Sequence, residues 1–455
     1  MSRLLKIVAL LAGAMIQPAA AAGSQWSTHH ETPWLVVRGQ PLTLSYQVDG
    51  THPDPMSGVL YVRNGRQRGF IRVPLAGKAG SLVARVPGSL AAGPRLSYYA
   101  VLRDRTGRSV TVPAAGARGP EQVWVVDRLL PVQLGLHRFG HLSAPDATVA
   151  RAGPKDVGFV GCTVAAERTT CADGSAPPQT GGCGCGEPSY GPSSFDIARD
   201  GSIWLLDEVN NRLLVWRPGR VGAFERSVSL PRTLNVTDFA LGPAGTIYID
   251  ATDHVGPGHT NIYALTPAGR VLWKIPVHAD APLRIGPDGA PLAAGIPSVW
   301  TPLTTPAGHP LSPAEQRSRT SPFQPLPGGL RLVTTQPSSH EVRLGLVNRT
   351  GQVVHAWRVT SRTELYPLTA TAALVGGDLV LAADVSRPNK WEHLVLRLTS
   401  TGGMRARLAL DAHALWGSLD VPATPLRVGP DGRLYQLRTN PTTGASIARY
   451  SLGPA

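Results

Sequence analysis

The sequence contains few charged residues and, beyond its first segment, no long apolar run. Only 16% of its 455 residues are charged, whereas Gly and Pro number 50 and 42. Because Gly and Pro interrupt helices, this composition disfavours long helices and favours short strands joined by many turns. The lack of a later apolar run excludes a transmembrane helix after the first segment. With 42% hydrophobic residues the chain can still build cores, and its length suits two or three domains.

Motifs of several functional classes are also missing. The sequence has no G-x-S-x-G elbow, no H-E-x-x-H pair and no phosphate-binding loop, so it predicts no catalytic residue. No DNA- or RNA-binding signature accompanies the formal net charge of +14. The charge predicts attraction to a polyanion such as teichoic acid or sulfated glycan. The alternative is a compositional bias toward Arg, because only five of the 44 basic residues are Lys.

Residues 1–22 have the features of an export signal. Arg3 and Lys6 give it a positive start, residues 4–16 form an apolar stretch, and residues 19–22 supply small side chains for cleavage. The sequence therefore predicts a secreted or periplasmic protein with a cleavable signal peptide and no transmembrane segment after cleavage.

All four cysteines lie in one loop-like stretch, at Cys162, Cys171, Cys183 and Cys185. An even number of cysteines in an exported chain predicts two disulfides, which would order a loop that cannot pack itself. Cys183 and Cys185 are too close to bridge each other readily, so each is expected to pair with Cys162 or Cys171. A thiolate metal site is the alternative, but the spacing matches no zinc pattern.

Residues 33–127 contain six short runs rich in Val, Leu and Tyr, separated by turn residues. This alternation predicts a small β-sandwich. Asn64-Gly65 lies between two runs and predicts a type I′ hairpin turn, because both residues tolerate a positive φ. The run at 96–113 resembles the late strands of immunoglobulin-like or fibronectin-like modules, a general resemblance that implies no binding residues.

Four arginines flank this predicted turn, and they are Arg63, Arg66, Arg68 and Arg72. Guanidinium groups gathered at one hairpin can bind phosphate or carboxylate groups bidentately. The alternative interpretation is that they only keep an edge hairpin solvated and unpaired.

From residue 129 to the end, a turn ending in Gly recurs between strand-like runs. The recurring glycines are 44, 44, 40, 48 and 55 positions apart, and they are Gly201, Gly245, Gly289, Gly329, Gly377 and Gly432. This period, with strands and turns throughout, predicts a six-bladed β-propeller over residues 129–455. The expected fold class is all-β, an N-terminal β-sandwich followed by a six-bladed β-propeller.

The first copy of the repeat, residues 191–216, has the most detailed pattern. Asp200-Gly201 forms a turn after the first strand, Asp207 ends the second, and Asn210-Asn211-Arg212 leads the third. This succession resembles the NHL repeat of propeller proteins. The resemblance implies an architectural role for Asp207 and Arg212, which pin the turn between two strands, with Asn211 in the same element. The other copies keep the first turn and lack Asn-Asn-Arg.

Three further segments interrupt or complete the repeat. Residues 133–139 are expected to supply the outer strand that the last blade lacks and so to close the ring. Residues 161–190 form a Cys-rich insert, and residues 301–329, with seven prolines, form a long surface excursion. The blade around Gly289 has the weakest strand pattern.

The first strand of each blade offers candidate binding residues. Alternate positions before each recurring Gly are mostly apolar, so the positions between them face the other way and are expected to converge on an axial channel. These positions are Asp196, Asp238, Arg284, Gln324 and Arg427. Acid and guanidinium groups there would bind a polar or anionic small molecule. The alternative is a set of structural ion pairs that fill the axis.

Three functions fit these patterns. The first is an exported, non-catalytic binding or scaffold protein that recognises a protein, a glycan or a cell-envelope polyanion through its sandwich and propeller surfaces. The second is a propeller enzyme, a lyase, lactonase or hydrolase with Ca²⁺ or Zn²⁺ at the axial channel, although the histidines show no metal-ligand spacing. The third is an envelope-anchoring protein whose basic sandwich holds a polyanionic polymer. The first function requires no cofactor, and nucleic acid is not expected as a partner.

Overall fold

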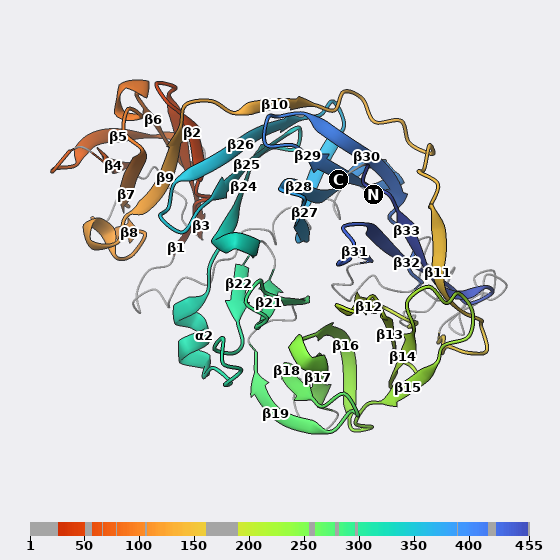
Figure 1. The fold of residues 1–455 in the computed structure, drawn as a ribbon. Coiled ribbons are helices and arrows are strands. Elements are labelled where there is room, and N and C mark those ends of the chain that lie inside the picture. Colours follow the sequence, from red (N-terminus) through yellow and green to blue (C-terminus); the bar gives the residue numbers. More distant parts are fainter. Residues whose placement is uncertain are drawn as a thin grey trace, which may run out of the picture. The chain divides into compact units, whose positions relative to one another are not determined.

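The protein is all-β, and the sheets after its N-terminal sheet have a six-bladed β-propeller arrangement (Figure 1). The computed structural model describes residues 26–50, 57–65, 67–78, 80–104, 107–160, 190–253, 260–277, 282–295, 299–388, 390–416 and 425–453. The predicted signal peptide and the four cysteines lie outside these ranges. Two compact units divide the chain, residues 1–134 with 330–361, and residues 135–329 with 362–455. No helix in the described ranges is long and apolar enough to cross a membrane.

The N-terminal part of the first unit is one nine-stranded sheet. Its strands are β1 (Trp26–His29), β2 (Leu35–Val37), β3 (Leu42–Gly50), β4 (Ser57–Asn64), β5 (Ile71–Lys78), β6 (Ser81–Val86), β7 (Arg95–Arg103), β8 (Ser109–Val112) and β9 (Glu121–Val126). Two 3₁₀ turns, η2 (Gly88–Leu90) and η3 (Gly116–Arg118), lie between them. The strands are ordered β1-β3-β6-β5-β4-β7-β9-β2, with β8 on β7. Strand β1 precedes the predicted start of this domain at residue 33 and pairs with β3.

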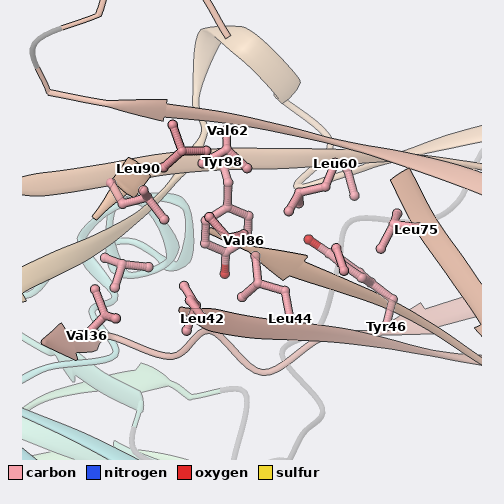
Figure 2. Packing of buried hydrophobic residues seen from close by; sticks show 14 of the residues in the cluster. Val36, Leu42, Leu44, Tyr46, Leu60, Val62, Leu75, Val86, Leu90 and Tyr98 are labelled. Atoms are coloured by element: carbon pink, nitrogen blue, oxygen red, sulfur yellow. The ribbon is translucent and has the colours of Figure 1, made fainter. Parts of the chain in front are cut away.

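Strand β5 joins the two halves of this sheet. Its residues 71–75 pair with β4, and its residues 76–78 pair with β6. Alternate residues of β3 and β6 and of β4 and β7 are buried in one apolar cluster, as the period of a strand requires. Figure 2 shows Leu44 of β3 and Leu60 of β4 on opposite sides of this cluster. Burial of such side chains is the main force that stabilises the domain.

The tight turn predicted at Asn64-Gly65 does not form. Asn64 still pairs with Leu96 of β7, and the amide of Gly65 donates to the carbonyl of Arg95 at 2.9 Å. Neither Asn64 nor Gly65 has the positive φ that a type I′ turn needs. Strand β4 instead continues through Asn64 and β5 begins only at Ile71, because pairing with β7 overrides the local preference of the Asn-Gly pair.

The first unit also contains four strands of one propeller sheet. This sheet has the order β10-β26-β25-β24-β23, with β10 (Leu130–Gln133), β23 (Gln324–Leu326), β24 (Leu330–Ser338), β25 (Glu341–Val347) and β26 (Val353–Thr360), and η6 (Pro327–Gly329) precedes β24. Within the unit, the Trp34 amide donates to Thr335 Oγ1 at 3.1 Å, and Trp124 Nε1 donates to the carbonyl of Gly351 at 2.9 Å. These bonds tie the N-terminal sheet to the propeller sheet that follows it in the unit.

Five further sheets make up the second unit. They are β11-β33-β32-β31, β12-β13-β14-β15, β16-β17-β18-β19, β20-β21-β22 and β27-β28-β29-β30. Their strands are β11 (Ala147–Ala152), β12 (Ser194–Ile197), β13 (Ile203–Asp207), β14 (Arg212–Trp216), β15 (Arg226–Ser229), β16 (Leu234–Leu241), β17 (Ile247–Asp253), β18 (Thr260–Leu265), β19 (Val271–Pro276), β20 (Leu283–Ile285), β21 (Pro291–Gly295), β22 (Val299–Pro302), β27 (Glu364–Val375), β28 (Asp378–Arg387), β29 (Lys390–Leu398), β30 (Met404–Asp411), β31 (Leu426–Val428), β32 (Leu434–Asn440) and β33 (Gly444–Tyr450), with η5 (Pro243–Gly245) after β16. The sheet around Gly289, which has the weakest sequence pattern, has three strands.

The recurring glycines occupy the turns after the first strands. All six have a positive φ, with values of 81, 79, 85, 73, 85 and 71° at Gly201, Gly245, Gly289, Gly329, Gly377 and Gly432. A side chain with a Cβ is strained in this left-handed region, so each turn favours Gly. The period visible in the sequence is therefore the period of one backbone conformation.

The last sheet is closed by a different segment from the one predicted. The sequence predicts residues 133–139 as the closing strand, but the outer strand is β11, which pairs antiparallel with β33. Gly135 has a φ of 65° and interrupts the predicted strand. Strand β11 instead has alternating side chains, of which Ala150 and Ala152 are buried in an apolar layer. Strand β10, just before Gly135, pairs parallel with β26.

The proline-rich segment 301–329 contains a short helix, α2 (Pro313–Arg319). Ser312 and Glu315 form a capping box: the Glu315 amide donates to Ser312 Oγ, and the Ser312 amide donates to the Glu315 carboxylate. Leu303 and Leu311 are fully buried, so part of the predicted surface excursion packs into the protein.

Candidate functional site

Four charged side chains meet on the innermost strands of the second unit. Strands β12, β16, β20 and β31 are terminal strands of their sheets, and β12 contacts β16, which contacts β20. In Figure 1, β12, β16 and β31 lie on the inner side of their sheets. Phe195 and Phe239 have no exposed surface and fill the layers between sheets, so the residues beside them point elsewhere. We call Asp196, Asp238, Arg284 and Arg427 the inner-strand cluster.

Both aspartates of the inner-strand cluster accept hydrogen bonds from the next sheet along the chain. Asp196 Oδ2 accepts from the amide of Leu241 at 2.8 Å, and Asp238 Oδ2 accepts from the amide of Leu283 at 2.7 Å. Asp238 Oδ1 also accepts from Ser194 Oγ, which lies on the preceding sheet. The two carboxylates therefore link three consecutive innermost strands.

The two arginines lie at the outer limit of ion-pair distance from these carboxylates. Arg427 Nε is 4.0 Å from Asp196 Oδ1, and Arg427 Nη2 is 3.9 Å from Asp238 Oδ1. Arg284 Nη1 is 3.7 Å from Asp238 Oδ2. Each guanidinium also donates to the carbonyl of the residue before it, and that of Arg427 lies 5.7 Å from the centre of the Phe195 ring. One arginine thus reaches across two sheets.

Burial shifts the protonation of this cluster. It raises the pKa of the Asp196 carboxyl, against the opposing effect of the Arg427 charge and of hydrogen bonds from two amides. Burial and the like charge of Arg427 lower the pKa of Arg284 to about 9, against the opposing effect of Asp238. The formal charges of the two acids and the two bases cancel. With all four groups ionised, the cluster therefore presents no net charge to a ligand.

Gln324, the fifth predicted residue, makes its contact elsewhere. Its Nε2 donates to the carbonyl of Ala372 on β27 at 2.8 Å, so it too links consecutive sheets. Its Oε1 is buried without a hydrogen-bond partner among the described residues. The structure thus brings four of the five predicted side chains together and leaves Gln324 in a separate link.

The repeat element of the first blade holds its turn through a buried carboxylate. Asp207 is fully buried, and its Oδ2 accepts from Arg212 Nε at 2.9 Å and from Asn210 Nδ2 at 2.8 Å. Its Oδ1 accepts from the amide of Gly158 at 2.9 Å. Asn211 has a φ of 49° and donates through its side chain to the carbonyl of Pro231. These contacts join β13, β14 and two loops.

One titratable group beside this element, Glu208, is not among the residues predicted from the sequence. Glu208 accepts from the amide of Gly191 at 3.1 Å and from Ser193 Oγ at 2.9 Å. Burial, with a smaller effect from the charge of Asp207, raises the pKa of Glu208 to about 7. Two adjacent acids at the end of a strand whose residues are otherwise apolar are the sequence signal that points to it. In the described part of the chain, no group of three or more His, Cys, Asp or Glu residues is placed to hold a metal ion.

The sheets and their innermost strands define an all-β protein with a six-bladed propeller arrangement. No family model and no curated protein matches the chain. Among solved structures, the chain is similar to a crystal structure of a tetra-tandem repeat in the extending region of a large adhesion protein. The two are 10% identical with a TM-score of 0.14 over 90% of this chain and 95% of the other. Similarity at this level supports no conclusion about fold or function.

Proposed function

We propose that the chain is an exported, non-catalytic binding protein in which the propeller is a scaffold and recognition takes place on outer surfaces. The observation that supports this most is the inner-strand cluster. Its carboxylates accept from backbone amides of neighbouring sheets, and its charges cancel. The groups that the sequence offers as the strongest ligand-binding candidates are thus engaged in holding blades together.

The proposal extends to the modules from which the protein is built. We propose that the N-terminal sheet is an immunoglobulin-like sandwich, which its two halves around one core support. The Asp207–Arg212 pair supports an NHL-type repeat in the first blade. Export through residues 1–22 and two disulfides among the four cysteines complete the proposal, because an oxidising compartment lets such bridges persist. Peptide mapping of the unreduced protein checks the disulfides, and four free thiols would exclude them.

Binding without chemistry is the outcome that tests the function. The mature chain, residues 23–455, is mixed with purified cell-wall sacculi and, separately, with lipoteichoic acid, alginate and neutral dextran. Co-sedimentation or retardation measures binding, and the size distribution of each polymer is measured before and after. We expect binding to at least one envelope polymer with no change in its size. Shortening of a polymer or release of an unsaturated product would establish an enzyme instead.

A further inference from the structure

The outward face of the N-terminal sheet has a distinct side-chain composition. On β4, β5 and β7, the residues that alternate with the core residues point away from it. Tyr61 lies opposite both Arg72 and Tyr99 in the register of these strands. We call Tyr61, Arg63, Phe70, Arg72 and Tyr99 the arginine face.

Aromatic rings hold the guanidinium groups of the arginine face. The rings of Tyr61 and Tyr99 are stacked with centres 4.7 Å apart and planes 3° from parallel, and the ring of Phe70 meets Tyr99 edge-on at 5.0 Å. The guanidinium of Arg63 lies 4.6 Å from the centre of the Phe70 ring, and that of Arg72 lies 5.9 Å from the centre of the Tyr61 ring. A guanidinium that rests on an aromatic ring keeps its N–H edges available for an anion and loses little freedom on binding.

The segment of sequence that carries this face has charge of one sign. Between Asp54 and Asp104 the sequence has eight basic residues and no acidic residue. Within the described part of the chain, no carboxylate lies within ion-pair distance of Arg63, Arg68 or Arg72, in contrast to Arg38, which pairs with Asp127 at 2.7 Å. Arg66, the fourth arginine of the predicted cluster, lies outside the described residues. Among the described residues, the arginines of this face are therefore held in place and have no carboxylate that neutralises them.

We propose that the arginine face binds an acidic polysaccharide that carries carboxylate groups, an inference that rests on the proposed binding function. A polymer with a carboxylate on successive sugars can meet both guanidinium groups at once, each through paired N–H donors. The aromatic rings are stacked on one another and carry the guanidinium groups, so they hold both arginines in position to meet such a polymer. Strands β4, β5 and β7, which present all of these side chains except Phe70, are fixed by the core beneath them, so the face is already organised for binding.

Single substitutions distinguish the contribution of the arginine face to binding from that of the protein's overall positive charge. The probe is alginate, a polyuronate, and its affinity for the mature chain is measured by calorimetry. We expect Arg63→Gln and Arg72→Gln each to weaken binding about tenfold, as the loss of a charge-assisted contact does. The matched control Arg85→Gln removes the same charge from an exposed position on β6 and should change affinity by no more than about twofold. Tyr99→Leu keeps every charge and should also weaken binding, with folding checked by circular dichroism.

Each result decides between the possibilities. If Arg72→Gln and Arg85→Gln weaken alginate binding equally, net charge alone is responsible and the arginine face is not the site. If the protein prefers lipoteichoic acid, whose anions are phosphates, the carboxylate assignment is wrong. If it binds neither polymer, the inference is overturned, whereas the sedimentation with whole sacculi decides the proposed function separately. Should Tyr99→Leu unfold the protein, the two Arg substitutions still decide whether this face is the alginate site.

Discussion

Replacing Asp238 with Asn tests whether the inner-strand cluster is a structural tie. The substitution keeps the size of the side chain but removes the negative charge 3.7 Å from Arg284 and 3.9 Å from Arg427. The Asp238 side chain is only 5% exposed, so water does little to compensate the two guanidinium groups that remain. Breaking a buried ion pair from one side costs about 3–5 kcal/mol. Because these distances are long for ion pairs, we expect the lower end, about 3 kcal/mol.

Urea unfolding of the mature chain measures this loss, as a lower midpoint with an unchanged slope. The control is Glu225→Gln, which breaks an ion pair with Arg217 whose side chains are 38% and 66% exposed. Such exposed pairs contribute less than about 1 kcal/mol. The double variant of Asp238→Asn with Arg427→Met restores the balance of charge and should recover part of the loss, a coupling of about 1–3 kcal/mol. If Asp238→Asn costs no more than the control, the cluster does not hold the blades together, and a ligand site there becomes the better explanation.

Three further predictions concern other contacts in the protein. Asp207→Asn should lower stability by about 3 kcal/mol, seen as a lower thermal midpoint, because it leaves Arg212 without its buried partner. Burial lowers the pKa of His30 from 6.5 to about 4, so below pH 6.5 the unfolded chain binds a proton that the folded chain does not. Between pH 7 and pH 5 this group should cost about 2 kcal/mol, and His30→Gln should flatten that part of the urea-unfolding profile; an unchanged profile would contradict it. Deleting residues 147–152 exposes the edge of β33 and should cause self-association, visible by light scattering.

The sequence predicts features that depend on one residue and its immediate neighbours. The repeat is visible because every turn needs a positive φ, which leaves Gly at each position, Gly201 among them. The inner-strand cluster is predictable because successive residues of a strand point to opposite faces, which places Asp196 on the face opposite to that of its apolar neighbours. This depends only on the strand and not on how the blade packs. Local periodicity thus specifies the face on which a side chain lies, but it does not distinguish Gln324, which makes a separate link, from the four residues that meet.

Features that depend on competition between distant segments are not predictable in this way. Any extended segment before the first blade could have supplied the closing strand. Strand β11 is hard to recognise in the sequence because the side chains that it buries are small alanines rather than large apolar residues. Asn64-Gly65 has the local chemistry of a tight turn, yet its outcome is decided by pairing with β7, more than thirty residues later in the chain. The pKa of Glu208 is raised to about 7 because the folded chain buries its carboxyl group, an effect that the hydrogen bonds from Ser193 and Gly191 oppose.

The polar character of the innermost strands has a cause in the propeller itself. The first strand of a blade has a partner on one side only, so its other edge presents amides that no ladder satisfies. Asp196 and Asp238 each accept from such an amide 45 residues further along, at Leu241 and Leu283. An apolar plug would leave these amides without acceptors in a buried region, and each unsatisfied group costs about 1–3 kcal/mol. On β12 and β16, the acids of the innermost strands therefore satisfy backbone amides of the neighbouring sheets, with or without a ligand.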